Sequence, residues 1–321
     1  MSAAPRVVIL SDEFGWHGRV LEQALVARGA VVEVASATRL MVHLEGVVRA
    51  TACHTPFVAH SSRAGPGIGD LRQDTLPDAV FVRGIPGGTL EQVCLRMECL
   101  HRLAEMGVAI VNPPRAVEIT VNKAMTSMRL AGAGIPMPAT FCGESLANAQ
   151  AFAAPIFKTG GKVVFKPLFG SQGEGLLLLQ NDAELRALPN PSGVYYLQAF
   201  VPPVGETYRD WRLFSIEGEL VAAMERRSAH WITNRAQGGA CITLPLTESL
   251  RELVARAHAV IDADYLGVDV LPSAEGPLMT EVNSIPAWQG LQRTTAFDVA
   301  GALADLVMRR IQHGPSGARR G

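Results

Sequence analysis

A glycine-rich segment between two apolar runs constrains the fold of this chain more than any other feature. Residues 163–167 read Val-Val-Phe-Lys-Pro, and residues 176–179 are four leucines. Residues 169–175, between them, read Phe-Gly-Ser-Gln-Gly-Glu-Gly. We interpret this pattern as strand, turn and strand, which is a hairpin and not the strand–loop–helix of a Walker phosphate site. Glycine lets backbone N–H groups approach a phosphate, and Lys166 can reach the same phosphate. Taken alone, however, this segment favours an ordinary hairpin with a surface lysine.

Three oxygen-bearing side chains nearer the C-terminal end predict a cation site. Asp269 lies in Gly-Val-Asp-Val-Leu, and Glu281 and Asn283 lie in Met-Thr-Glu-Val-Asn. Residues two apart on a strand share one face, and a short turn at residues 272–277 pairs the two strands. Two carboxylates and an amide oxygen suit magnesium, with phosphates at the remaining positions. The alternative is three solvated polar residues on an exposed sheet face.

Arginines form a third pattern between residues 209 and 235. They are Arg209, Arg212, Arg226, Arg227 and Arg235. A guanidinium group can neutralise a phosphate or hold a carboxylate through two hydrogen bonds. For most of these arginines we favour a surface position, paired with Asp210, Glu217, Glu219 or Glu225. Arg226 and Arg227 cannot both point inward on a regular strand, because neighbouring side chains alternate between faces.

The whole chain reads as an α/β protein of several parts. Over residues 1–114, short apolar runs alternate with helical segments, which predicts a small Rossmann-like lobe around a parallel sheet. We expect residues 115–195 to form a small lid subdomain and residues 196–313 a C-terminal subdomain that carries the cation site. Residues 314–321 are polar and glycine-rich and are expected to be a frayed tail.

Composition narrows the classes of protein to which the chain can belong. Apolar residues make up 48% of the 321 residues, which is enough for a large core. Lys and Arg total 29 and Asp and Glu total 30, so no excess charge favours nucleic acid or an acidic membrane. The five cysteines show no metal-binding spacing. No apolar stretch reaches the roughly 18 residues of a membrane span, so we expect a cytoplasmic protein.

Five motifs occur in an order that resembles a known family. They are Phe165-Lys166-Pro167, the glycine-rich segment Gly170 to Gly175, Thr233-Asn234, Gly267-Val268-Asp269, and Glu281-Val282-Asn283-Ser284-Ile285-Pro286. Over roughly residues 110–312 the sequence resembles RimK-type ATP-grasp ligases, and is similar to the tetrahydromethanopterin or coenzyme-type α-L-glutamate ligases among them. The resemblance implies a Rossmann-like lobe followed by a two-lobed ATP-grasp domain. It also implies ATP with Mg²⁺ or Mn²⁺, and addition of glutamate or a similar amino acid to a carboxyl group.

The resemblance assigns roles to matching positions. Lys123 and Lys166 resemble the two ATP-contacting lysines, and Asp210 and Asn234 resemble further nucleotide contacts. The phosphate-covering loop is represented by Gly170, Ser171, Gln172, Gly173, Glu174 and Gly175. The hinge whose backbone meets adenine is represented by Gln198, Ala199, Phe200 and Val201. The metal ligands are represented by Asp269, Glu281 and Asn283. Separately from the resemblance, we expect Arg212 or Arg235 to stabilise the anionic intermediate.

Two departures from the family pattern qualify these expectations. Ala199 stands where relatives usually carry glutamate, so the acidic contact to the nucleotide is missing or comes from elsewhere, with Glu206 as a candidate. Gln237 stands where some relatives carry a basic residue, so the acceptor can differ. Alanine in place of Asp269 or Glu281 is expected to abolish amide formation and leave the fold intact.

The sequence leaves the identity of the substrates and two alternative functions undecided. The expected partners are a small-molecule carboxylate and an amino acid, with a protein acceptor as an option, and a homo-oligomer is expected. A phosphotransferase on the same scaffold would form no amide. A binding or scaffold protein that responds to ATP without catalysis is the alternative that Ala199 favours and the complete metal trio opposes.

Overall fold

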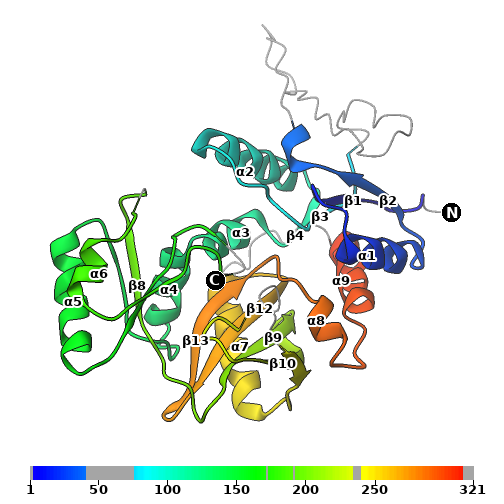
Figure 1. The fold of residues 1–321 in the computed structure, drawn as a ribbon. Coiled ribbons are helices and arrows are strands. Elements are labelled where there is room, and N and C mark those ends of the chain that lie inside the picture. Colours follow the sequence, from blue (N-terminus) through cyan, green and yellow to red (C-terminus); the bar gives the residue numbers. More distant parts are fainter. Residues whose placement is uncertain (1–2, 41–75, 171–172, 191, 234–239, 314–321) are drawn as a thin grey trace, which may run out of the picture. The chain divides into compact units, whose positions relative to one another are not determined.

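The computed structural model describes residues 3–40, 76–170, 173–190, 192–233 and 240–313. The chain divides into two compact units. Unit 1 comprises residues 1–115, 287–289 and 298–321, and unit 2 comprises residues 116–286 and 290–297. Figure 1 shows the mixed helix and sheet architecture that the sequence predicts.

Unit 1 is built on a four-stranded parallel sheet in the order β2-β1-β3-β4. The strands are β1 (Arg6–Leu10), β2 (Val31–Ala35), β3 (Ala79–Val82) and β4 (Ala109–Val111). The helices are α1 (Trp16–Val26), α2 (Leu90–Glu105) and α9 (Val299–His313), and a 3-10 helix, η1, spans Ala37–Arg39. In this order, β2 lies on one side of β1, whereas β4 lies on the opposite side of β3, so the connections β1–β2 and β3–β4 run in opposite directions across the sheet. Right-handed crossovers therefore place α1 and α2 on opposite faces of the sheet, as Figure 1 shows.

The ends of the unit 1 helices follow local sequence signals. Gly29 has φ +83° and ends the turn after α1. Thr89 caps α2, because its hydroxyl accepts from the Gln92 N–H while the Gln92 side chain accepts from the Thr89 N–H. These signals explain why the helices expected near residues 16–28 and 89–106 form close to those bounds.

Helix α9 corrects the expected domain boundary. We expected residues 298–313 in the C-terminal subdomain, but α9 packs on α1, β3 and β4 in unit 1. Its apolar side, which includes Leu303, Leu306 and Val307, is fully buried. An amphipathic helix shows that one of its faces is covered, but its sequence does not say which sheet covers it.

Unit 2 contains a five-stranded antiparallel sheet in the order β11-β10-β9-β12-β13. The strands are β9 (Tyr208–Ile216), β10 (Glu219–Ser228), β11 (Ala240–Thr243), β12 (Tyr265–Ser273) and β13 (Gly276–Asn283). Four helices that lie wholly or mostly in unit 2 are α3 (Pro114–Val121), α4 (Lys123–Gly132), α7 (Glu248–Ile261) and the short α8 (Gln289–Gln292). The core of this sheet joins Leu213, Val268 and Val282 to Leu253 of α7 and Leu130 of α4.

A second sheet of unit 2 has four strands in the order β5-β8-β6-β7. The strands are β5 (Thr140–Gly143), β6 (Val163–Phe165), β7 (Leu177–Leu179) and β8 (Tyr195–Ala199). Helices α5 (Leu146–Lys158) and α6 (Asp182–Arg186) belong to this part. The antiparallel pairing of β6 with β7 confirms the hairpin expected around the glycine-rich segment.

The small subdomain differs in extent from the expected residues 115–195. Ala116, Ile119 and Leu130, on α3 and α4, are buried in the core of the larger sheet. The expected boundary at residue 195 also falls on the first residue of β8. The second sheet therefore begins at β5 and ends with β8, because packing partners rather than chain order define the part. The expected tail at residues 314–321 lies outside the described residues.

Among the described residues, no helix has both the length and the apolar character that a membrane crossing requires.

Candidate functional site

A cleft within unit 2 brings together most of the predicted site residues. Polar lining residues come from both sheets, from the loops that adjoin their strands, and from α4. They are Lys123, Lys166, Glu174, Gln198, Arg209, Asp210, Thr233, Asp269, Thr280 and Glu281. Apolar lining residues include Val164, Phe200, Val201, Tyr208, Trp231 and Leu271. The cleft therefore has an apolar part, formed partly by the residues that follow β8, and a charged part at β12 and β13.

The predicted cation ligands lie on paired strands. Asp269 on β12 is directly opposite Glu281 on β13, and Gly267 is opposite Asn283. Residues 269, 281 and 283 therefore share one face of the sheet. Asp269 and Glu281 line the cleft, whereas Asn283 is not among its described lining residues.

A β-bulge at Thr280 produces this arrangement. From the turn outward, the register pairs Ser273 with Gly276 and Val270 with Met279, and it then shifts by one residue before Asp269. Without that shift Asp269 would oppose Thr280, and Glu281 would point to the other face. The Thr280 hydroxyl donates to the Asp269 carbonyl at 3.2 Å. The extra residue thus aligns two carboxylates that uniform strand pairing would separate.

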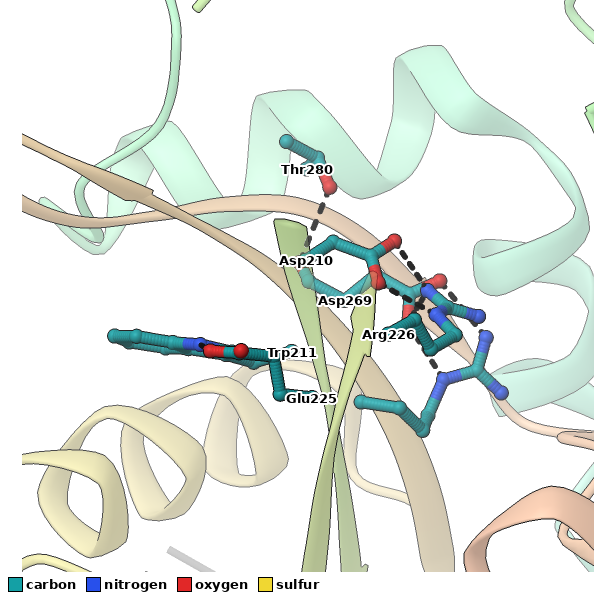
Figure 2. A network of polar contacts seen from close by, with 7 residues as sticks. Asp210, Trp211, Glu225, Arg226, Asp269 and Thr280 are labelled. Atoms are coloured by element: carbon teal, nitrogen blue, oxygen red, sulfur yellow. Dashed lines mark hydrogen bonds and ion pairs between the residues drawn. The ribbon is translucent and has the colours of Figure 1, made fainter. Parts of the chain in front are cut away.

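Asp269 takes part in a buried network of four charged side chains. Arg212 donates to both of its carboxylate oxygens, from Nε at 2.5 Å and from Nη2 at 2.8 Å. Arg226 Nη2 lies 2.9 Å from Asp269 Oδ1 and also bonds Asp210, as Figure 2 shows. All four residues are at most 8% exposed. Two guanidinium groups thus balance two carboxylates away from water.

Arg226 corrects an expectation from the sequence. A surface position was expected for most of the five arginines, yet Arg226 is 5% exposed and bridges Asp210 and Asp269. Arg227, its neighbour, points the other way and pairs with Glu225, so the alternation expected for these two arginines is confirmed. In Figure 2, Glu225 and Trp211 form a separate pair on the opposite side of the strands from Arg226, and the Trp211 N–H donates to Glu225 at 3.0 Å.

A second bulge explains why sequence reasoning missed Arg226. The β9–β10 turn is two residues long, with φ 51° at Glu217 and 87° at Gly218, which is typical of a tight hairpin. Counting outward from that turn would place Arg226 opposite Arg209. A register shift near Leu220 places it opposite Asp210 instead. Uniform pairing from the turn therefore misses the Asp210–Arg226 pair by one residue.

The carboxylates of the site have opposite electrostatic character. Burial alone would raise the pKa of Asp269, but Arg212 and Arg226 outweigh burial and lower this pKa to about 2. Burial raises the pKa of Glu281, and the negative charge of Asp269 raises it further, against the opposing effect of Lys123 and Lys166. Glu281 is thus the carboxylate whose charge is poorly compensated by the protein.

Two lysines face Glu281 in the charged part of the cleft. Burial lowers the pKa of Lys166 to about 8, with Glu281 opposing this effect and Lys123 adding to it. Burial also lowers the pKa of Lys123, again against the attraction of Glu281. Lys166 Nζ donates to Gln198 Oε1 at 2.7 Å, and Lys123 Nζ donates to the Gly170 carbonyl at 2.8 Å. The second bond links α4 to the glycine-rich hairpin.

The glycine-rich hairpin needs glycine at several positions. Gly170, Gly173 and Gly175 have φ of 145°, 79° and 70°. A Cβ on Gly175 would also lie 2.7 Å from Pro167 Cγ. Gly170, Gly173 and Glu174 line the cleft, and the predicted residues Ser171 and Gln172 lie outside the described residues.

The expected hinge follows β8 into the apolar part of the cleft. Gln198, Ala199, Phe200 and Val201 all line the cleft. The Phe200 ring has edge contacts with Tyr208 at 6.4 Å and with Trp231 at 6.3 Å between ring centroids. Glu206 is exposed and is not among the described lining residues, so the structure gives it no role at the hinge.

Three residues of the predicted site loop cannot be placed. Asn234, Arg235 and Gln237 lie outside the described residues. Within the described ranges, no cluster of three or more His, Cys, Asp or Glu side chains is arranged as a metal site. The predicted set differs from such a cluster, because it combines two carboxylates with the amide oxygen of Asn283.

Sequence comparisons match this chain to one family. Residues 120–307 match the model of the RimK-like ATP-grasp domain. The tetrahydromethanopterin:α-L-glutamate ligase of Methanococcus maripaludis is 38% identical over 231 residues, which cover 70% of this chain and 77% of that protein. A probable α-L-glutamate ligase 2 of Hahella chejuensis is 28% identical over 68% of this chain and 72% of its own length.

Solved structures agree on the fold. The ATP-grasp ligase PsnB, complexed with a minimal precursor, matches with a TM-score of 0.69 at 19% identity and covers 96% of this chain and 99% of its own. A RimK domain ATP-grasp protein from Sphaerobacter thermophilus matches with a TM-score of 0.67 at 22% identity over 94% and 99% of the two chains. The family match and the 38% identical relative show that the chain belongs to the RimK-like ATP-grasp family and is an ATP-dependent ligase, and the solved structures share its fold.

Proposed function

We propose that this ligase joins a substrate carboxylate to the amino group of an amino acid, best represented by glutamate, through an acyl phosphate. The observation that carries the proposal is the charged part of the cleft. There, Lys123 and Lys166 face Glu281 beside a glycine-rich hairpin, and no described residue forms an ion pair with either lysine. Ammonium groups that face a carboxylate without forming a direct ion pair suit a triphosphate.

The proposed position of ATP follows from the two parts of the cleft. The triphosphate would lie at Lys123 and Lys166, under the backbone N–H groups of the hairpin. The adenine would lie against Phe200 and its neighbours, where the backbone after β8 reaches the cleft. Ala199 offers no carboxylate there, so the affinity for the base would come mainly from backbone hydrogen bonds and apolar contact.

The donor set fits a divalent cation. Glu281 is raised in pKa because it is buried near another carboxylate, and a cation would relieve that repulsion. Asn283 shares its face and adds an amide oxygen, while Asp269 is already held by two arginines and would contribute from a fixed position. Bound Mg²⁺ or Mn²⁺ would supply charge neutralisation for the phosphates.

In the proposed first step, a carboxylate oxygen of the substrate attacks the γ-phosphorus, and the bond from that phosphorus to the bridging oxygen of ADP breaks. Lys123 and Lys166 hold the phosphates in line, and their charge offsets the negative charge of the transferring group. Arg212, fixed by Asp269, and Arg235 are the proposed partners of the anionic intermediate.

In the second step, the amine nitrogen attacks the acyl carbon and loses a proton. The phosphate leaves with the oxygen that came from the substrate carboxylate, and an amide remains. The relatives named tetrahydromethanopterin:α-L-glutamate ligase support glutamate as the amine and a small-molecule cofactor as the carboxylate. The PsnB structures with precursor peptides support a protein carboxylate as the other option.

Isotope transfer tests the proposal directly. A substrate carrying ¹⁸O in its carboxylate is incubated with ATP, Mg²⁺ and glutamate, and the released phosphate is analysed by mass spectrometry. The proposal predicts one ¹⁸O in each phosphate and ADP release that requires both substrates. Phosphate without label, or label that remains on a phosphorylated product without amide, would instead support hydrolysis or simple phosphotransfer.

A matched pair of variants tests the site. Glu281→Gln should abolish amide formation because the charge that faces the lysines and the cation is lost, whereas Glu275→Gln, in the exposed β12–β13 turn, should retain wild-type turnover. Retained turnover in Glu281→Gln would contradict the assignment.

A further inference from the structure

Gln198 makes a side-chain contact that a backbone hinge does not require. It is 3% exposed, and its Oε1 accepts from Lys166 Nζ at 2.7 Å. Its Nε2 donates to Thr140 Oγ1 at 3.1 Å, and the Thr140 hydroxyl donates to the Pro138 carbonyl at 2.8 Å. The chain of contacts therefore runs from backbone through Thr140 and Gln198 to the ammonium group.

The hydrogen-bond pattern sets the orientation of the amide. The Thr140 hydroxyl has one proton, and the Pro138 carbonyl accepts it, so a lone pair of Thr140 faces Gln198. An amide N–H of Gln198 must meet that lone pair, and the amide oxygen then faces Lys166. The reverse orientation would place N–H groups against an ammonium group that has only donors.

Strand register places the three residues side by side. Gln198 on β8 lies opposite Thr140 on β5 and opposite Val164 on β6. Lys166 follows Val164 by two residues, and its backbone N–H donates to the Tyr196 carbonyl at 3.0 Å. Lys166 therefore shares a face with Val164 and is the diagonal neighbour of Gln198. A central strand of the sheet thus supplies the contact that holds the lysine.

We propose that Gln198 is a positioning residue for Lys166, and that its side chain holds the ammonium group toward the phosphates instead of reading the adenine. This inference rests on the proposed function of Lys166. A neutral amide oxygen orients the ammonium group without neutralising it, which a carboxylate at the same position would do. The charged groups that face Lys166 are Lys123 from α4, Glu281 from β13 and Asp269 from β12.

Nucleotide affinity separates positioning from a role at the base. Isothermal titration measures Mg²⁺ with AMPPNP, and separately adenosine, against the wild type, Gln198→Met and Lys166→Met. Methionine keeps the length and volume of glutamine without its acceptor. We expect Gln198→Met to bind AMPPNP about tenfold more weakly, which corresponds to one hydrogen bond to a charged group, and to bind adenosine as the wild type does. Weaker adenosine binding by the same factor would overturn the inference.

A double-mutant cycle tests whether Gln198 acts through Lys166. In a Lys166→Met background, Gln198→Met should cause no further loss of AMPPNP affinity. Independent, additive losses would overturn the inference. If Lys166→Met binds AMPPNP as the wild type does, the phosphate role of the lysine fails and the proposed function with it. If Lys166→Met weakens binding and Gln198→Met does not, the positioning role alone fails.

Thr140 supplies a second, milder test that leaves Gln198 in place. Thr140→Val keeps a β-branched shape but removes the hydroxyl that anchors the amide, and Thr140→Ser restores the hydroxyl. We expect weaker AMPPNP binding in Thr140→Val, unchanged adenosine binding, and recovery in Thr140→Ser. Equal AMPPNP affinities in the two variants would contradict the chain of contacts, even if Gln198→Met did not fold.

Discussion

Replacing Asp269 should destabilise unit 2 as well as abolish activity. The expectation from sequence, that alanine at this position leaves the fold intact, overlooked the two arginines that hold the carboxylate. The structure shows Arg212 and Arg226 bonded to Asp269, with side-chain exposures of 10%, 6% and 8%. Asp269→Asn keeps the shape and removes the charge, so both guanidinium groups lose a buried ionic partner.

The size of the effect can be worked from the pKa. Arg212 and Arg226 bring the pKa of Asp269 to about 2, against about 3.9 in an unfolded chain. That difference of roughly two units corresponds to about 2.5 kcal/mol at neutral pH. Breaking a buried ion pair by removing one partner typically costs about 3–5 kcal/mol. We therefore expect Asp269→Asn to lower the free energy of unfolding by about 3 kcal/mol.

The matched control lies directly across the β12–β13 pair. Glu281→Gln also removes one charge from the site, but burial and Asp269 raise the pKa of Glu281, so its ionised form is not stabilising. Its stability should differ from the wild type by less than about 1 kcal/mol. Differential scanning calorimetry at pH 7 measures the unfolding of unit 2 in all three proteins. Asp269→Asn should shift that transition downward by roughly 6–12 °C.

The pH dependence has a definite sign. Because the folded-state pKa of Asp269 is lower than its unfolded value, its contribution is complete above about pH 4 and is lost as the pH falls toward about 2. The difference between the wild type and Asp269→Asn should therefore shrink in acid. Equal stabilities of Asp269→Asn and Glu281→Gln at pH 7 would refute the reasoning, because the arginines would then gain nothing from the carboxylate.

Four further outcomes follow from the same structure. The ratio kcat/KM for ATP should fall as the pH rises through about 8, where Lys166 loses its charge, and a flat profile to pH 10 would count against a charged lysine in ATP capture. Deleting Thr280 removes the extra residue of the bulge but leaves Met279 opposite Val270 and Glu281 opposite Asp269, so Glu281 keeps its face and turnover should stay within about tenfold of the wild type; a loss of about a thousandfold in a protein that circular dichroism shows to be folded would contradict this reading of the register. Gly175→Ala combines φ 70° with a proline contact at 2.7 Å, so the KM for ATP should rise by about tenfold, and an unchanged KM would mean that the hairpin does not cover the phosphates. Thr89→Ala removes the capping box of α2 and should lower the stability of unit 1 by about 1 kcal/mol in calorimetry without changing kcat.

The sequence by itself determined the elements and the chemistry of the site. Alternation and turn residues located the strands around Lys166 and Asp269, because apolar spacing and glycine act over a few neighbouring residues. The order of motifs also indicated the family, because each motif is a short run of consecutive residues that can be read without knowing the fold. Helix α9 was likewise predicted, because its apolar residues recur with helical spacing and form a face that must be buried.

Only the tertiary structure decided which residues meet. The bulges at Thr280 and near Leu220 set the registers that bring Glu281 beside Asp269, and Arg226 between Asp269 and Asp210. A one-residue shift in pairing moves every side chain beyond it to the other face, and the packing of the whole sheet selects between the two registers. The same holds for α9, whose partner is in unit 1, because an apolar face specifies burial but not the surface that provides it.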